Sequence, residues 1–392
     1  MSCPRACVLL AISCGLLCFP PTTNARQKTK QLSSSDPVWQ IDLRKFGYEA
    51  WTRTKAERLI TTYWIDGIGF TDNQTIAVAW LTLDNSSGVR ISEKHPPAPE
   101  PAHLHAIFLD AATGTKKEQT EWPTMSFPVR FLTTYDGQFL ICTAQTIQLF
   151  SSSLQLLRSL PVSVSPSDRG CASPFKFAQV SSPSARSILF PSEDRGTKEE
   201  QLLNTESFAT VSLQLHGIRA FSDDWVIGTC GKPSQTCIAR TTDEGWHPFG
   251  AYSPNRAAGF LNNTTVLIAT VNGGAVLALD GSQRFTFTLP DHEFISRVIT
   301  SVDGQRFAVL ADRLRGLTSP TLDMYPFASN DRVIVYNITD GHAVFDNKVK
   351  GTSPWMPSLG SLNETKNQPA LSPDGTLLAI LSSAQLMLYK IP

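Results

Sequence analysis

Short apolar segments recur along the chain, and each follows directly after a tight polar turn. They are four to six residues long and rich in β-branched and aromatic residues, which favour strands. Their near-continuous apolar character predicts strands that are buried on both faces. The seven segments are Thr75–Trp80, Phe139–Cys142, Ser187–Phe190, Trp225–Gly228, Thr265–Ala269, Arg306–Leu310 and Leu377–Leu381.

The turns before these segments share a composition that suits tight hairpins. Asp-Gly and Asn-rich pairs supply the left-handed backbone that two-residue hairpin loops need. Pro183-Ser184-Ala185 takes the equivalent place in one degenerate copy. The other six turns are Thr71-Asp72-Asn73, Tyr135-Asp136-Gly137, Ser222-Asp223-Asp224, Leu261-Asn262-Asn263, Val302-Asp303-Gly304 and Pro373-Asp374-Gly375. Their mean spacing of about 50 residues is near the period of propeller blades.

The last copy of the repeat carries a resemblance to known families. Leu371-Ser372-Pro373-Asp374-Gly375-Thr376-Leu377-Leu378-Ala379 resembles the repeats of WD40-like and TolB-like β-propellers. The resemblance covers residues 36–392 and implies an all-β, seven-bladed β-propeller with four-stranded antiparallel blades. The chain lacks the Gly-His and Trp-Asp dipeptides of true WD40 repeats, so their hydrogen-bond network is not expected. A two-sheet β-sandwich and an open array of repeats are the alternatives.

The two ends of the repeat region predict how the ring closes. The chain ends directly after the third strand of the seventh copy, which leaves that blade without an outer strand. Residues Val38–Leu43 alternate between apolar and polar side chains and precede the first blade. We therefore expect this N-terminal segment to supply the missing strand and remove an open sheet edge.

The first 25 residues have the pattern of a secretory signal peptide. A single basic residue, Arg5, precedes an apolar run from Cys7 to Phe19, and small residues stand at −3 and −1 before a cleavage site after Ala25. The run is too short to cross about 30 Å of hydrocarbon as an anchor. A lipoprotein signal at Ala11-Ile12-Ser13-Cys14 is the alternative. We expect export to the periplasm or the extracellular space, residues 26–35 as a flexible linker, and residues 36–392 as a single propeller domain.

The amino-acid composition excludes further classes of protein. The 34 Lys and Arg residues balance 34 Asp and Glu residues, which argues against a nucleic-acid binder. A hydrophobic share of 41% excludes a disordered chain. No second long apolar stretch follows the leader, so we expect no membrane span, and we expect a monomer.

The cysteines are consistent with an oxidising compartment. Cleavage after Ala25 would leave four of them, an even number. Cys230 and Cys237 flank the turn between the second and third strands of the fourth blade, so we expect a disulfide that closes this hairpin. A metal pair and two free thiols are the alternatives. Cys142 lies in a core strand and Cys171 in a connection between blades, and their pairing is left open.

Enlarged connections fall on one face of the expected ring, and loops on a rigid scaffold commonly carry binding residues. The segments are Asn85–His103, Pro191–Gln201, Ala311–Asp331 and Gly351–Asn367. The candidate binding residues are His95, Arg313, Arg315, Tyr325, Phe327 and Trp355. The alternative is that these are tolerated surface insertions without a role.

The search for reactive chemistry identifies no catalytic residue, no metal site and no cofactor motif. His103 and His105 share one face of an expected strand, and too few further ligands lie nearby in the sequence for a metal site. The segment Thr241–Gly245 resembles a partial Asp-box, which is a structural turn. Asp136, Asp303 and Asp374 occupy turn positions, where they can cap the backbone.

Two functional hypotheses follow. The favoured one is a non-enzymatic exported scaffold that binds a protein or a glycan through the loops of one face. The alternative is a cofactor-dependent, quinoprotein-like or glycosidase-like propeller enzyme with its site over the central channel. The two differ in whether charged side chains from several blades converge on that channel, which depends on strand register.

Overall fold

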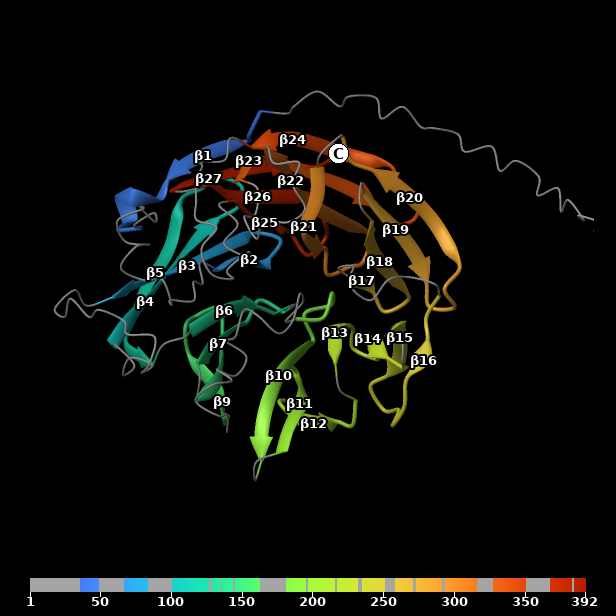
Figure 1. The fold of residues 1–392 in the computed structure, drawn as a ribbon. Coiled ribbons are helices and arrows are strands. Elements are labelled where there is room, and N and C mark those ends of the chain that lie inside the picture. The colour runs from blue at the N-terminus through green and yellow to red at the C-terminus, as the bar shows by residue number, and fades with distance from the viewer. Residues whose placement is uncertain are drawn as a thin grey trace, which may run out of the picture. The chain divides into compact units, whose positions relative to one another are not determined.

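Seven antiparallel sheets follow one another along the chain. The computed structural model describes residues 36–48, 67–83, 101–126, 129–134, 136–143, 145–162, 181–194, 197–215, 217–231, 235–250, 258–270, 273–290, 293–315, 327–349, 367–382 and 384–392. The sheets are arranged around a ring as the blades of a β-propeller, which confirms the predicted fold class (Figure 1). Residues 32–392 belong to one unit.

The first four blades run from Gly67 to Pro248. Blade 1 has β2 (Gly67–Asp72), β3 (Thr75–Leu83), β4 (Pro101–Asp110) and β5 (Lys116–Ser126). Blade 2 has β6 (Val129–Thr133), β7 (Phe139–Thr143), β8 (Thr146–Phe150) and β9 (Leu156–Pro161). Blade 3 has β10 (Ser187–Asp194), β11 (Thr197–Asn204) and β12 (Thr210–Leu213). Blade 4 has β13 (Ile218–Phe221), β14 (Trp225–Cys230), β15 (Gln235–Arg240) and β16 (His247–Pro248).

The last three blades complete the ring. Blade 5 has β17 (Ala258–Asn262), β18 (Thr265–Thr270), β19 (Gly273–Ala278) and β20 (Gln283–Thr288). Blade 6 has β21 (Glu293–Thr300), β22 (Arg306–Arg315), β23 (Phe327–Asn337) and β24 (Ala343–Val349). Blade 7 has β25 (Asn367–Leu371), β26 (Leu377–Ser382), β27 (Gln385–Lys390) and β1 (Trp39–Asp42).

Blade 3 is described over three named strands, and residues 163–180 before it lie outside the described residues. Its described sheet has the order β10-β11-β12, and the place of the first strand is marked by a single bridge between Ser181 and Ile188. The other six sheets have four strands each, as predicted. The degenerate turn Pro183-Ser184-Ala185 lies in this blade, just before β10.

The hydrophobic core is divided among the interfaces between neighbouring blades. Each of seven buried clusters combines side chains from two adjacent blades, including the last blade with the first. Successive residues of a second strand point to opposite interfaces: Ile76 packs against blade 7, whereas Ala77 packs against blade 2. This explains the continuous apolar segments, because a strand between two blades is covered on both faces.

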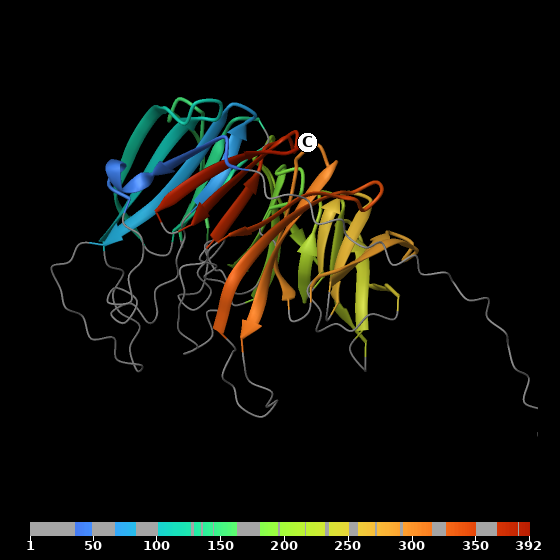
Figure 2. The same ribbon diagram turned by 90° about the horizontal axis from the view of Figure 1, so that it is seen from above.

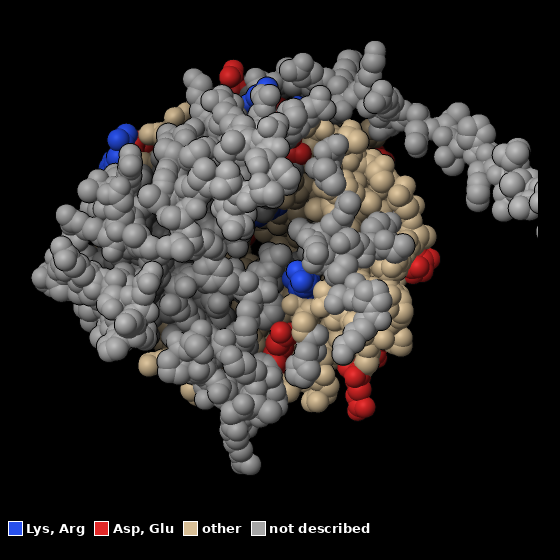
Figure 3. Space-filling model, in the orientation of Figure 1, with Lys and Arg blue, Asp and Glu red and all other residues tan. Residues whose placement is uncertain are grey.

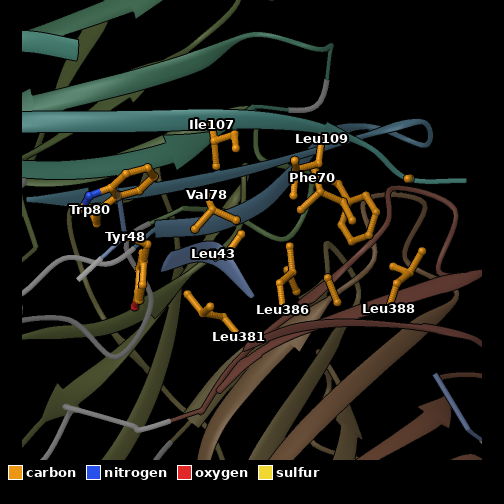
Figure 4. Close-up of a cluster of buried hydrophobic side chains, with 14 of the residues drawn as sticks. Leu43, Tyr48, Phe70, Val78, Trp80, Ile107, Leu109, Leu381, Leu386 and Leu388 are labelled. Atoms are coloured by element: carbon orange, nitrogen blue, oxygen red, sulfur yellow. The ribbon is translucent and has the colours of Figure 1, made fainter. Parts of the chain in front are cut away.

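The ring closes through the N-terminal strand, as predicted. β1 pairs antiparallel with β27, with Trp39 opposite Leu388 and Asp42 opposite Gln385. Trp39 also donates its Nε1 hydrogen to the carbonyl oxygen of Ala111 in blade 1 at 2.9 Å. The next residue after the strand, Leu43, begins the 3-10 helix η1 (Leu43–Phe46) and is fully buried between blades 7 and 1 (Figure 4). The segment therefore completes one blade and packs against the next.

The turns between first and second strands form one face of the ring, which we call the turn face. They are linked from blade to blade by hydrogen bonds. The backbone N–H of Asp374 donates to Oδ1 of Asn73 at 3.1 Å, and that of Asp303 donates to the carbonyl of Pro373 at 3.0 Å. The hydroxyl of Ser184 likewise donates to Asp223 of the following blade at 2.6 Å. Figure 2 shows the same ring from a direction turned by 90°.

The turn aspartates cap their own backbone, as the sequence predicts. Ser301 and Ser372 donate their hydroxyls to Asp303 and Asp374 at 2.5 and 2.6 Å. Burial acts to raise the pKa of Asp374, but hydrogen bonds from Ser372 and Thr376 outweigh it and hold that pKa below its usual value. These carboxylates are occupied in shaping the turns.

Candidate functional site

The face opposite the turn face carries the connections between second and third strands, and we call it the hairpin face. Blades 1 and 6 have the longest strands there: β3 and β4 have 9 and 10 residues, and β22 and β23 have 10 and 11. The pairing of β22 with β23 continues to Arg315 opposite Phe327. The hairpin of blade 6 thus continues as paired strands as far as these two residues.

Three of the predicted binding residues lie on this hairpin. Arg313 and Arg315 are in β22, and Phe327 is the first residue of β23. The register places Arg313 opposite Glu293 of β21. His95, Tyr325 and Trp355 lie outside the described residues, so the grouping of the six predicted residues stays a prediction.

One predicted loop is a hairpin of strands. The segment Pro191–Gln201 was expected as an enlarged, charged connection, but β10 continues to Asp194 and β11 begins at Thr197. The register places Glu193 opposite Lys198. Opposite charges at facing positions favour strand pairing, so the charges that suggested a loop are compatible with a hairpin.

The disulfide between Cys230 and Cys237 is present, as predicted. It joins β14 to β15 at the hairpin face of blade 4, with the two Cα atoms 5.9 Å apart. Cys142 is also disulfide-bonded, to a cysteine outside the described residues. Its pairing with Cys171 stays a prediction.

A histidine cluster lies at the hairpin end of β4 in blade 1. Nδ1 of His103 is 2.7 Å from Oε1 of Glu121, and Nδ1 of His105 is 3.5 Å from Oε2 of the same carboxylate. Nε2 of His105 is 2.8 Å from the hydroxyl of Thr82, and its ring stacks on Trp80 at a centroid distance of 5.4 Å. Both histidines therefore face one carboxylate of the neighbouring strand β5.

The electrostatics of this cluster make it responsive to pH. Burial lowers the pKa of His105, the negative charge of Glu121 acts in the opposite direction, and a charge on His103 lowers it further. Among the described residues, no group of three or more His, Cys, Asp or Glu side chains is arranged to hold a metal ion. Sequence reasoning missed Glu121, because a register shift between Phe108 and Leu109 brings Glu121, and not Thr120, opposite His105.

A second charged cluster lies inside blade 6 and supports the long hairpin. Nε of Arg332 in β23 donates to Oδ1 of Asp346 in β24 at 2.6 Å, and Nη2 donates to Oδ2. Nη1 of Arg332 is 3.7 Å from Oε2 of Glu293 in β21. The three side chains are 14%, 7% and 9% exposed, respectively. Hydrogen bonding to Asp346 raises the pKa of Arg332 in spite of its burial.

Comparisons with known proteins give distant structural likenesses. No known family model matches the sequence, and no curated protein matches it. The WD40 domain of Sif2 is 12% identical with a TM-score of 0.45, over 84% of this chain and 97% of that one. TolB from Acinetobacter baumannii is 12% identical with a TM-score of 0.36, over 76% and 78%. An oligogalacturonate lyase in complex with manganese is 10% identical with a TM-score of 0.47, over 84% and 89%. Each of these TM-scores is below 0.5, so the fold class rests on the chain's own seven sheets.

The described residues include no helix that is long and apolar enough to span a bilayer.

Proposed function

We propose that this chain is an exported β-propeller scaffold that binds a protein or a glycan through its hairpin face. The observation that carries the proposal is the difference between the two faces. The turn face consists of short turns that are hydrogen-bonded to one another. Backbone N–H and carbonyl groups used in these bonds are not free to bind a partner. The hairpin face presents the extended β22–β23 hairpin, the disulfide-closed hairpin of blade 4 and the histidine cluster.

The disulfides support the compartment that the proposal requires. Cys230 and Cys237 are bonded to each other, and Cys142 is bonded to a further cysteine. Structural disulfides form and persist in oxidising compartments and are rare in a reducing cytosol. Together with the leader pattern before Arg26, they favour a periplasmic or extracellular location. The N-terminal sequence of the exported protein tests this directly, and we expect it to begin at Arg26.

Site-specific photo-crosslinking tests the binding face. A photoreactive side chain placed at Arg315 or at Phe327, on the hairpin face, should give an adduct of one defined mass in the exported fraction of the native host. The matched controls are Ser282 and Asp340, which lie in turns at the opposite face. A glycan partner would appear as a sugar-containing adduct. Adducts formed equally from both faces, or from neither, would contradict the proposal.

A further inference from the structure

Basic side chains from three different blades stand on the strands that line the centre of the ring. Arg130 lies in β6, Arg219 in β13 and Arg297 in β21, and each of these is the first strand of its blade. Arg130 and Arg297 stand six residues before the turn aspartates Asp136 and Asp303, so they occupy equivalent positions in blades 2 and 6. Equivalent positions on the innermost strands of a propeller lie at a similar depth along its axis.

The centre of the ring is a hollow into which such side chains can reach. Figure 3 shows the molecule hollowed near its middle, with Lys or Arg atoms in and beside the hollow. Gly259 on β17, the first strand of blade 5, leaves open space: a Cβ added there would meet no atom within 4 Å. Arg219 and Arg297 are exposed and Arg130 is half-buried, although all three stand on the innermost strands. Side chains in a narrow water-filled channel contact solvent although the inner strands of the blades surround them.

Arg130 and Arg297 repel each other across the channel. Enclosure by protein lowers the pKa of Arg130 to about 10, and repulsion from Arg297 contributes to this shift. Enclosure also lowers the pKa of Arg297. Blades 2 and 6 are not neighbours, because blades 7 and 1 lie between them on one side of the ring. The two guanidinium groups therefore interact through the central space. Both stay protonated at neutral pH, so two like charges are held together.

These arginines have no counter-charge among the described residues. None of the three forms an ion pair or a side-chain hydrogen bond there, whereas other arginines do. Arg306 illustrates the difference, since it donates to the carbonyl of Gly375 at 3.0 Å. The acid on the same strand as Arg297 is Glu293, which lies beside Arg332. Charged groups in a hollow whose pKa is shifted by burial and by a neighbouring charge are candidates for a ligand site.

We propose that the central channel binds a small polyvalent oxyanion, held between Arg130 and Arg297 with Arg219 contributing from blade 4. Guanidinium groups donate two parallel hydrogen bonds to phosphate or carboxylate oxygens, which matches an anion with at least two negative charges. Phosphate and small di- or tricarboxylates share this chemistry. The site is independent of the hairpin face, and either proposal can fail without the other.

Isothermal titration calorimetry of the disulfide-bonded protein, residues 26–392, tests the site. The probes are inorganic phosphate, pyrophosphate and citrate, with sodium acetate at matched ionic strength as the monovalent control. Saturable binding by phosphate or pyrophosphate would identify a phosphate ligand, and saturable binding by citrate alone would identify a polycarboxylate. Arg130→Gln and Arg297→Gln should each weaken binding roughly ten- to hundredfold, as expected for a lost charge-assisted hydrogen bond. Arg284→Gln, an exposed position on the outer strand β20, is the matched control and should bind like the wild type.

A second readout separates a binding role from a structural one. Without a polyvalent anion and at low salt, Arg297→Gln should melt at the same temperature as the wild type or higher, because it removes repulsion from Arg130. A lower melting temperature would show that Arg297 supports the fold and would overturn the proposal. The proposal also fails if none of the probes binds saturably, or if both channel variants bind as the wild type does. If Arg130→Gln does not fold, Arg219→Gln serves as the second channel variant, with a weaker loss expected.

Discussion

Replacing Arg332 by methionine tests how the buried charges of blade 6 contribute to stability. Methionine keeps the length of the side chain and removes its charge, so Asp346 and Glu293 would be left buried without a counter-charge. Breaking a buried ion pair on one side costs about 3–5 kcal/mol. The side chains concerned are at most 14% exposed, so screening by water reduces this figure little. We expect the free energy of unfolding to fall by about 3 kcal/mol at pH 7.

Urea unfolding followed by tryptophan fluorescence measures the change. A loss of this size corresponds to a midpoint lowered by about 1 M when the urea slope is about 3 kcal/mol per M. The difference between variant and wild type should narrow as the pH falls from 7 toward about 4, because protonation neutralises the stranded carboxyl groups. The penalty therefore has a defined pH dependence.

Two control variants make the result interpretable. The neutral triple variant Glu293→Gln/Arg332→Met/Asp346→Asn should recover most of the lost stability, because it leaves no unpaired charge. Arg44→Met removes the exposed partner of Asp42 and should hardly change the midpoint. A loss below about 1 kcal/mol for Arg332→Met, or a loss that does not vary with pH, would refute the reasoning.

Three further predictions concern the closure, the disulfide and the histidine cluster. Deleting residues 36–44 should sharply lower the melting temperature, since it removes β1 and the buried Leu43, and an unchanged melt would contradict the closure. Replacing Cys230 and Cys237 by alanine should lower the free energy of unfolding by about 2 kcal/mol, as expected for a short closed loop. A non-reducing peptide map of the wild type that shows both thiols free would exclude the bond. The pKa of His105 is lowered in the folded protein, so the unfolded chain binds this proton more readily. The free energy of unfolding should therefore fall as the pH drops below 6.5, the ordinary pKa of the side chain. His105→Gln should flatten this dependence between pH 6.5 and 5 in thermal melts, and an unaltered slope would assign it to other groups.

Much of the fold could be predicted because its determinants are local. A hairpin turn and the strand after it lie within about ten residues of each other, so Asp374, Gly375 and Leu377–Leu381 already indicate one blade. The missing outer strand of blade 7 then points to Val38–Leu43 as its replacement.

The sites could be predicted less well because they depend on register between distant strands. Glu121 meets His105 only through the pairing of β4 with β5, which includes two irregularities in register. Arg130 and Arg297 are 167 residues apart, and each is unremarkable in its own strand. Their meeting follows from the ring geometry, in which equivalent positions of blades 2 and 6 face the same axis.

The pairing of β1 with β27 sets the order of events when this chain folds. Trp39 and Leu388 are 349 residues apart in the sequence, so their pairing is a strongly non-local contact. Until they meet, β27 presents an unpaired edge to which other chains can add. Blades 1 to 6 can each form from one continuous segment of the chain, but blade 7 is complete only when β1 has paired with β27. Aggregation during folding should therefore depend on how quickly this last strand docks, even when the finished ring is stable.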